Sequence, residues 1–502
     1  MQNKKLLLNP NKLVRYLQRD CKEFTKDDII KYVVENNIEM INFRYVAEDG
    51  KLKTLNFIIT SLEHLENILS TGERVDGSSL FSFIDAGSSD LYVVPRFKTA
   101  FENPFSNVPT LEILCSFYNS NGKPLESAPE YILKKANQDF TKSTGYNFKA
   151  MGELEYYIKS EKTDLFPGID QKGYHSSEPF TNFEELRLEA MHLIAQCGGQ
   201  IKYGHSEVGN FSTETEYYEQ HEIEFLPVDP EDAVDQLIIG KWVLRMLANQ
   251  YGVDLSFAPK ITIGKAGSGL HIHMMAEKDG KNICVENQKL SNECKKMIAG
   301  IMDLSAPLTA FGNTIPTSYL RLVPHQEAPT YVCWGEKNRS VLVRVPLGWI
   351  GDASNMVSHL NTNEEKTNND FSNKQTFEFR VPDGSADIYN LMSGLIVACK
   401  HGLEMPNSLE KAEELYADTN IFADTWKEKL EKLEQLPTCC YDSADKLAEK
   451  REIFEKNGIF PAGMIDAVVN NLKSFDDQNL NDELLENHKK LKKIVDKYMH
   501  CM

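Results

Sequence analysis

The sequence contains no apolar segment as long as the ~20 residues that a membrane-spanning helix needs. Its first residues, MQNKKLLLNPNKLV, include too short an apolar stretch for a signal peptide. The ten cysteines are scattered without any CxxC pair, and even the adjacent Cys439 and Cys440 are not spaced like metal ligands. We therefore expect neither a zinc ribbon nor a disulfide framework, and we expect no membrane association and a reducing, cytoplasmic location.

Positive charge is also scarce, since 55 lysines and arginines stand against 74 aspartates and glutamates and the net charge is −19. No basic run, and no basic stretch interleaved with aromatic residues, offsets this balance. Because such a chain repels phosphate backbones, nucleic acid is not an expected partner. The sequence also lacks a GxxxxGK[ST] phosphate-binding loop, a protein-kinase signature and a G-x-S-x-G nucleophile elbow, which excludes those three kinds of site.

A chain of 502 residues is long for one hydrophobic core, so more than one domain is expected. Near the start, apolar residues at helical spacing predict a helix with Thr25 as its N-cap. Two β-rich runs on either side of Asp49-Gly50 predict a hairpin, and the strand-like LYVVP and LEILCSFY follow. These signals predict a small α+β domain over residues 1–124 and a larger domain over residues 125–502.

The larger domain is expected to mix helices and strands and to end in charged helices. Thr181 and Glu184 fit a capping box at the start of a helix that ends at Gly198-Gly199. Asp229, followed by proline, predicts the start of a second helix that runs to Gly252. We find no internal repeat and no low-complexity linker.

Four short segments have ionisable residues two positions apart: Glu153-Leu-Glu155, Glu222-Ile-Glu224, His271-Ile-His273 and Glu378-Phe-Arg380. Residues i and i+2 of a strand face the same way, so each segment would have an ionisable face opposite an apolar one. A single segment of this kind is more often a strand with one solvated face. A sheet that contains all four segments would bring carboxylates and imidazoles together. The excess of carboxylates over imidazoles favours a hard cation such as Mg²⁺ or Mn²⁺ over zinc.

Arginines form the basic counterpart of these segments. Arg321, Arg339 and Arg344 lie in mostly uncharged surroundings within residues 317–346. The planar guanidinium fork suits carboxylate and phosphate oxygens, although any one of these arginines could equally be a surface residue with a packed stem. Metal-binding carboxylates together with an arginine cluster indicate an anionic, metal-bound substrate, of which a nucleoside triphosphate is the commonest.

Eight motifs, in order along nearly the whole chain, resemble those of glutamine synthetases of the type I family of bacteria and archaea. They are RVDGSSL, SSDLYVVP, MGELEYYI, HSEV with EQHEIEF, KAGSGLHIHM, SYLRLVPHQEAP, NRS with RVP, and FEFRVPD. The resemblance implies an α+β chain with an N-terminal β-grasp domain. A catalytic domain with a curved antiparallel sheet and a helical C-terminal region follows it.

The activity implied by this resemblance is the ATP-dependent ligation of ammonia to the γ-carboxylate of glutamate through γ-glutamyl phosphate. It implies two or more Mg²⁺ or Mn²⁺ ions per site, with ATP, glutamate and ammonium as substrates. It also implies a homo-oligomer of two stacked hexameric rings whose active sites lie between subunits.

Site residues carry over from the same resemblance, position by position. One metal is implied at Glu155, Glu207 and Glu222, and another at Glu153, His271 and Glu378. ATP phosphates are implied at His273 and Arg344, and glutamate at Gly267, Arg321 and Arg380. Catalytic roles are implied for Arg339 at the transferring phosphoryl group, for Glu327 as a flap carboxylate, and for Asp76 as an acceptor of the ammonium proton.

The chain departs from the family pattern at a few positions. Ala266 stands where asparagine is usual, Thr376 where an arginine is frequent, and SADIYN at residues 385–390 replaces the usual ANPYL. The loop between Glu207 and Glu222 is longer than usual. The tyrosine-bearing segment that is adenylylated in some relatives has no recognisable equivalent, since the nearest tyrosine, Tyr416, lies in a different context.

Three alternatives to this activity stay open on the sequence alone. A γ-glutamylamine synthetase keeps the fold and the acyl phosphate but uses an amine, whereas the intact loop around Asp76 favours ammonium. A binuclear metallohydrolase also uses H-x-H on a strand, but usually on an early strand that is joined by further histidines. A non-enzymatic structural relative is disfavoured by the presence of every implied metal ligand.

Overall fold

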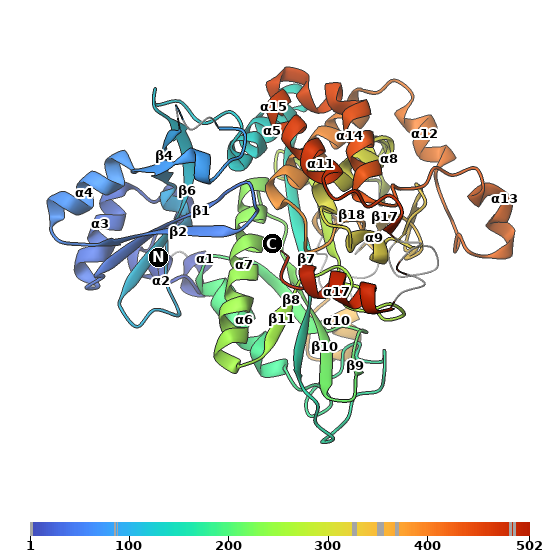
Figure 1. The fold of residues 1–502 in the computed structure, drawn as a ribbon, viewed down its shortest axis with the longest axis horizontal. Helices are drawn as coiled ribbons and strands as arrows, with labels where there is room; N and C mark the ends of the chain where they lie inside the picture. The colour runs from blue at the N-terminus through green and yellow to red at the C-terminus, as the bar shows by residue number, and fades with distance from the viewer. Residues whose placement is uncertain are drawn as a thin grey trace.

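Two β-sheets organise the chain, and Figure 1 shows them side by side, with the N-terminal sheet in blue. The computed structural model describes residues 4–84, 87, 89–323, 329–348, 356–366, 371–480, 484 and 488–501. Each sheet carries helices, which confirms the expected mixed α+β class. Within the described ranges, no helix combines the length and the apolar character needed to cross a bilayer.

The first sheet has the strand order β2-β1-β6-β4-β3, with β5 paired to β6. Its elements are α1 (Lys4–Leu7), α2 (Lys12–Leu17), α3 (Lys26–Glu35), β1 (Met40–Val46), β2 (Leu52–Ile58), α4 (Leu62–Thr71), β3 (Glu73–Asp76), β4 (Asp90–Pro95), β5 (Phe101–Glu102) and β6 (Thr110–Asn119). The predicted hairpin around Asp49-Gly50 is confirmed, and β1 pairs with β6 in parallel. Thr25 caps α3 through a capping box, as expected, and apolar residues of α3 and α4 join the core of this sheet.

The second sheet has the order β16-β17-β18-β12-β7-β10-β8, with β11, β13 and β9 paired to β7, β12 and β10. Its strands are β7 (Asn147–Glu161), β8 (Ile201–Ser206), β9 (Phe211–Ser212), β10 (Glu216–Phe225), β11 (Asp254–Ser256), β12 (Leu270–Lys278), β13 (Lys281–Asn282), β16 (Trp334–Glu336), β17 (Val343–Val345) and β18 (Phe377–Phe379). A separate small hairpin joins β14 (Val285–Glu286) and β15 (Lys289–Leu290). All four segments with paired ionisable residues therefore reach this one sheet, although β18 ends just before Arg380.

The helices of the larger region are α5 (Pro129–Thr144), α6 (Glu184–Gln196), α7 (Pro230–Tyr251), α8 (Asn292–Gly312), α9 (Ser318–Arg321), α10 (Met356–Leu360), α11 (Ile388–Glu404), α12 (Ser408–Glu414), α13 (Lys427–Leu430), α14 (Cys440–Glu455), α15 (Ala462–Lys473) and α17 (His488–Tyr498). The predicted helix from Asp229 to Gly252 is confirmed, with proline at its first position and Gly252 in the left-handed conformation at its end.

The capping box predicted at Thr181 and Glu184 is wrong. The N-cap of α6 is Phe183, whose side chain makes no capping hydrogen bond. The hydroxyl of Thr181 instead donates to the buried carboxylate of Glu219, which also accepts hydrogen bonds from the backbone N–H groups of Asn182 and Phe183. A tertiary carboxylate therefore takes over the role that the local sequence assigned to the capping box.

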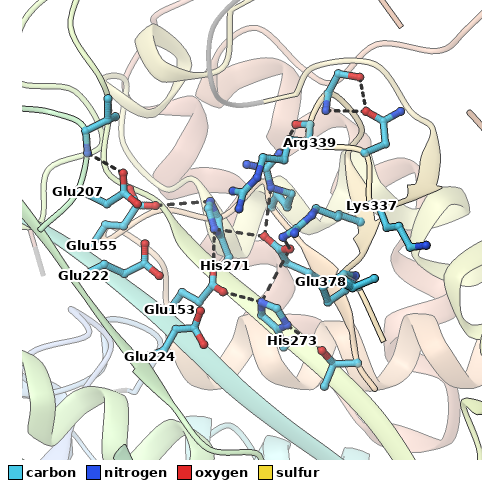
Figure 2. Close-up of a pocket in the computed structure, with 18 of the residues that line it drawn as sticks. Glu153, Glu155, Glu207, Glu222, Glu224, His271, His273, Lys337, Arg339 and Glu378 are labelled. Atoms are coloured by element: carbon cyan, nitrogen blue, oxygen red, sulfur yellow. Dashed lines mark hydrogen bonds and ion pairs between the residues drawn. The ribbon is translucent and has the colours of Figure 1, made fainter. Parts of the chain in front are cut away.

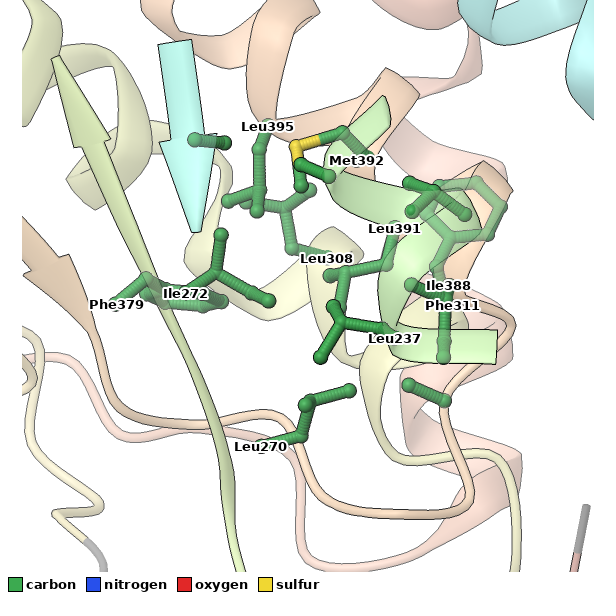
Figure 3. Close-up of a cluster of buried hydrophobic side chains, with 14 of the residues drawn as sticks. Leu237, Leu270, Ile272, Leu308, Phe311, Phe379, Ile388, Leu391, Met392 and Leu395 are labelled. Carbon is green, nitrogen blue, oxygen red and sulfur yellow. The ribbon is translucent and has the colours of Figure 1, made fainter. Parts of the chain in front are cut away.

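One face of the second sheet packs on helices and the other faces a cavity. Leu154 on β7, Ile272 on β12 and Phe379 on β18 are fully buried beneath α7, α8 and α11. Figure 3 shows this apolar layer, in which Leu237 of α7 and Leu391 of α11 lie near the strands. Because side chains alternate along a strand, the ionisable residues between these apolar ones must face the other way.

Helices α8 and α11 cross at two glycines. A Cβ on Gly300 would lie 2.0 Å from the carbonyl oxygen of Ala398 and 2.5 Å from the backbone nitrogen of Gly402. A Cβ on Gly402 would lie 2.0 Å from the carbonyl oxygen of Lys296. The two helices can approach this closely only because neither position has a side chain.

The change Gly300→Ala should lower the midpoint of thermal unfolding by several degrees, because overpacking a tight contact costs about 1–3 kcal/mol. Gly463→Ala in α15 is the matched control, since a Cβ there would meet nothing within 4 Å. Its midpoint should stay the same or rise slightly, because alanine is the better helix former. Calorimetry on both variants measures the difference, and equal shifts would contradict the close crossing.

Candidate active site

Strand pairing brings the carboxylates of β7 and β10 together. In the antiparallel register, Glu153 lies opposite Glu224 and Glu155 lies opposite Glu222. All four are buried, and all four point to the face of the sheet away from the helices. Strand β8 adds His205, which lies opposite Glu222.

Strands β12 and β18 add the imidazoles and another carboxylate. His271 lies opposite Glu153, and His273 lies opposite Glu378, which in turn lies opposite Arg344 on β17. Five neighbouring strands thus contribute to one cluster, because every contributing residue has the same parity along its strand.

The cluster lines a cavity of about 1370 Å³, part of which is drawn in Figure 2. Every described residue predicted for the site lines this cavity except Asp76. Glu327 lies outside the described residues. Asp76 ends β3 in the first sheet, where its exposed carboxylate accepts hydrogen bonds from the hydroxyls of Ser78 and Ser79 at 2.7 Å each. The hydrogen bonds from Ser79 and Ser78 lower the pKa of this carboxyl to about 2, so it is a permanent anion at neutral pH.

Glu153 is the centre of the cluster. One of its oxygens lies 2.8 Å from Nδ1 of His271 and the other lies 2.8 Å from Nε2 of His273. Nδ1 of His271 also lies 3.4 Å from Glu378. The other nitrogen of His273 bonds the hydroxyl of Thr376 at 2.9 Å, so the threonine that replaces an expected arginine orients this ring.

Among the described residues, three groups of side chains have ligand atoms within 4.8 Å of one another and could hold a metal ion. They are Glu153 with His273 and Glu378, His205 with Glu207 and Glu222, and Glu153 with Glu222 and Glu224. Carboxylate oxygens with one imidazole are a donor set that suits Mg²⁺ or Mn²⁺. These groups overlap the two predicted sets of ligands but are not identical to them, since His205, Glu224 and His273 appear in them.

Burial disfavours the charged form of every carboxylate in the cluster. At Glu153 burial is outweighed by His273 and His271 together, which hold the pKa of the carboxyl well below its usual range. Burial raises the pKa of Glu155 to about 7. Burial, together with repulsion from Glu153 and Glu155, raises the pKa of Glu222 well above its usual range. The cluster therefore holds protons that a divalent cation would displace on binding.

Arginines occupy the wall next to this cluster. Arg344 lies 2.9 Å from Glu378, and Nε of Arg380 lies 3.1 Å from the same carboxylate. Arg380 also donates to the backbone oxygen of Arg339. Arg321 is buried and donates to the backbone oxygen of Val381 at 2.8 Å.

A glycine-rich loop completes the wall. A Cβ on Gly269 would lie 2.6 Å from both Nη2 of Arg321 and Nε2 of His271, so only glycine fits there. The carbonyl oxygen of Gly267 accepts a hydrogen bond from Nε2 of Gln220 at 3.0 Å. The backbone of the loop 265–269 therefore lies close to side chains of the site, as the sequence suggests.

Three further lining residues, Gln220, His205 and Glu224, contact this cluster but were not assigned a role from the sequence. Gln220 donates to Glu155 at 3.2 Å as well as to the glycine loop, and His205 joins a possible metal group. Glu224 accepts from Tyr203 at 2.6 Å and from Lys202. A spacing of two positions was visible in the sequence for all three, since Gln220 and Glu224 flank Glu222 and His205 precedes Glu207.

Two family models match the chain. One, described as the glutamine synthetase catalytic domain, matches residues 126–487, and the other, described as the glutamine synthetase beta-grasp domain, matches residues 37–120. The chain is 31% identical over 436 residues to the glutamine synthetase of Clostridium saccharobutylicum, covering 85% of this chain and 90% of that protein. It is 28% identical over 434 residues to that of Methanococcus maripaludis, covering 84% and 89%.

Solved structures show the same fold. The cryo-EM structure of Plasmodium falciparum glutamine synthetase superposes with a TM-score of 0.72 at 20% identity, covering 91% of this chain and 97% of that one. A complex of GmaS with ADP superposes with a TM-score of 0.69 at 18% identity, covering 90% and 96%. The expected β-grasp domain followed by a domain with a curved sheet is confirmed.

The change Glu153→Gln should weaken the binding of Mg²⁺ by at least about tenfold, a loss that even outer-shell partners of a metal ligand can cause. The reason is that Glu153 belongs to two of the three possible metal groups. Glu216→Gln is the matched control, because this carboxylate lies on the neighbouring strand β10, does not line the cavity, and pairs with Lys159 at 2.7 Å. Calorimetric titration of both folded variants decides the matter, and equal affinities would contradict the assignment.

Proposed function

The chain belongs to the glutamine synthetase family, and we propose that it ligates ammonia to the γ-carboxylate of glutamate, using ATP and forming glutamine, ADP and phosphate. The observation that carries this proposal is the meeting of a carboxylate–imidazole cluster with arginines in one cavity. A γ-carboxylate is a poor acyl donor because its leaving group is oxide. Phosphorylation of that carboxylate to γ-glutamyl phosphate supplies a good leaving group.

The metal-binding roles follow the predicted positions. Glu155, Glu207 and Glu222 hold one Mg²⁺ or Mn²⁺, and Glu153, His271 and Glu378 hold another. These cations, when bound, neutralise the oxygens of the transferring phosphoryl group. The contacts of Glu153 with His271, and of His271 with Glu378, support the second set.

The remaining residues divide between the two substrates. His273 and Arg344 bind ATP phosphates, and Arg339 stabilises the phosphoryl group during transfer. Arg321 and Arg380 bind the carboxylates of glutamate beside the backbone of Gly267. The close packing of Gly267 on the side chain of Arg321 supports this placement, since a Cβ there would lie 3.0 Å from Cγ of the arginine.

Ammonium has no lone pair, so it must lose a proton before it attacks the acyl phosphate. Asp76 is suited to bind the cation, because its carboxyl stays ionised, with a pKa of about 2. Its second role, accepting the proton as the nitrogen attacks, rests on the family resemblance. Glu327 shields the intermediate and helps in the same step.

We propose that the assembly is the type I arrangement of two stacked hexameric rings, with residues 1–124 forming the first domain and 125–502 the second. Asp76 does not line the cavity of its own chain. A ring with head-to-tail contacts lets the first domain of one subunit complete the site of the next.

Co-assembly of Asp76→Ala and Arg321→Ala subunits tests the shared site. Each variant alone should be nearly inactive, whereas random mixing at equal amounts should restore roughly a quarter of the sites in a closed ring. The reason is that a site then draws Arg321 from one subunit and Asp76 from its neighbour. Mixed oligomers purified through two tags are assayed for glutamine, and activity no higher than that of either variant alone would place both residues in one chain.

The second candidate, a γ-glutamylamine synthetase, has the same fold as this chain. Release of ADP in the presence of glutamate and Mg²⁺ should be fastest with ammonium and much slower with methylamine, ethylamine or larger amines. A preference for an amine would select the second candidate. Release of ADP that needs no nitrogen donor and yields no glutamine would contradict ligation altogether.

A further inference from the structure

We propose that a second cavity, between the first domain and the helices behind the active-site sheet, binds a small organic carboxylate. It has a volume of about 230 Å³ and lies where the β1–β2 hairpin meets α7 and the start of α11. The site is separate from the active-site cavity and goes beyond the proposed ligation.

Cations dominate the walls of this cavity. Lys241 and Arg245 lie one turn apart on the same face of α7, and Lys51 lies at the tip of the β1–β2 hairpin. Asp387 is the one carboxylate among the lining residues, and its side chain already accepts a hydrogen bond from the backbone N–H of Asn390. Because Asp387 is also the N-cap of α11, the positive end of that helix faces the same space. Arg245 already donates to the backbone oxygen of Cys501, so Lys51, Lys241 and the helix end are the groups that make this space favour an anion.

Lys241 is the residue that most needs an anion. It is only 5% exposed, and its ammonium group donates to the backbone oxygen of Gly384 at 2.7 Å. Within the described ranges, Lys241 forms no ion pair with a carboxylate, and Asp383 is the carboxylate that favours the charged form of this lysine. Burial and the nearby Arg245 lower the pKa of Lys241 to about 7, as expected for a buried ammonium group without a counter-ion.

The other walls are apolar and flat. Ile238, Trp242 and Tyr389 line the cavity together with Val46 and Leu52. Inorganic phosphate or sulfate would leave these surfaces uncovered, whereas an organic carboxylate would place its charge at the cations and its hydrocarbon part against the rings. Both α-amino acids and dicarboxylates have this chemistry, and Asp387 would favour an amino acid by pairing with its ammonium group.

A chain of contacts connects this cavity to the residues proposed to bind glutamate. Lys241 donates a hydrogen bond to the backbone oxygen of Gly384. Gly384 packs closely on Phe257 because it has no side chain, since a Cβ on Gly384 would lie 2.2 Å from the backbone oxygen of Phe257. Two residues earlier, the backbone oxygens of Val381 and Pro382 accept hydrogen bonds from Arg321. The residues that depart from the family pattern, 385–390, include four that line the cavity. A ligand on Lys241 would thus act on the segment that positions Arg321.

Calorimetric titration of the assembled enzyme, without ATP or glutamate, tests the binding itself. The probes are alanine, succinate and propionate, with propionamide as the neutral control. Saturable binding of a carboxylate, but not of propionamide, is the expected result. No saturable binding by any of the three carboxylates would overturn the proposal.

Three variants locate the bound probe. Lys51→Glu reverses a charge at the exposed tip of the hairpin and should weaken binding by about tenfold, because it places like charges together. Lys53→Glu is the matched control, since Lys53 lies two residues later in the same hairpin, pairs with Asp49 at 2.5 Å and does not line the cavity. Arg321→Gln reports on the active-site cavity and should bind the probe like the wild type. Equal binding by the two lysine variants, or loss only in Arg321→Gln, would overturn the proposal.

The link to the active site rests on the proposed function and is measured separately. The probe should change the KM for glutamate at least about twofold in the wild type, as expected for coupled sites. The change should be smaller in Lys51→Glu than in Lys53→Glu. Binding without any change in KM would overturn the link, and an inactive enzyme that still binds the probe would contradict the proposed ligation but not the cavity.

Discussion

Repulsion among buried carboxylates is the constraint on which the rest of this structure depends. Glu153, Glu155, Glu222, Glu224 and Glu378 share one face of one sheet, and burial makes each charge costly. The structure offsets that cost unevenly, because His273 and His271 together hold Glu153 ionised, while burial and neighbouring carboxylates make Glu222 favour its proton although His205 lies 3.9 Å away. The uneven distribution of charge is what prepares the cluster for divalent cations and anionic phosphate.

Because the carboxylates on this face of the sheet repel one another, the strands that carry them need a rigid support. The opposite face of the same strands provides it, since Leu154, Ile272 and Phe379 are fully buried under α7, α8 and α11. The close crossing of α8 and α11 at Gly300 and Gly402 makes this layer dense. Preorganised electrostatic sites gain from such rigidity, because their charges must not relax towards each other before the substrate arrives.

The two domains meet through charged contacts as well as through the second cavity. Arg96 of the first domain pairs with Asp235 on α7 at 2.7 Å, and Lys98 pairs with Asp232 at 2.6 Å. These pairs lie on the same helix as Lys241 and Arg245, which line the cavity. One helix thus joins the first domain, the second cavity and the apolar support of the active-site sheet.

The sequence alone determined the strands of the site, because alternation has a period of two and survives in any context. Glu153 with Glu155, and His271 with His273, were placed on strands from that spacing, and the caps of α3 and α7 were placed from local signals at Thr25 and Asp229. The eight motifs, read in order along the chain, indicated the family.

Only the tertiary structure decided which of these residues touch. Register between β7, β10 and β12 placed His273 as well as His271 against Glu153, and it brought His205, Gln220 and Glu224 into the cavity. Thr181 lost its predicted capping role to Glu219, a residue distant in sequence. The second cavity is likewise formed by a hairpin and two helices that lie far apart along the chain. Such pairings depend on strand register and helix packing, which are long-range contacts and leave no local periodicity in the sequence.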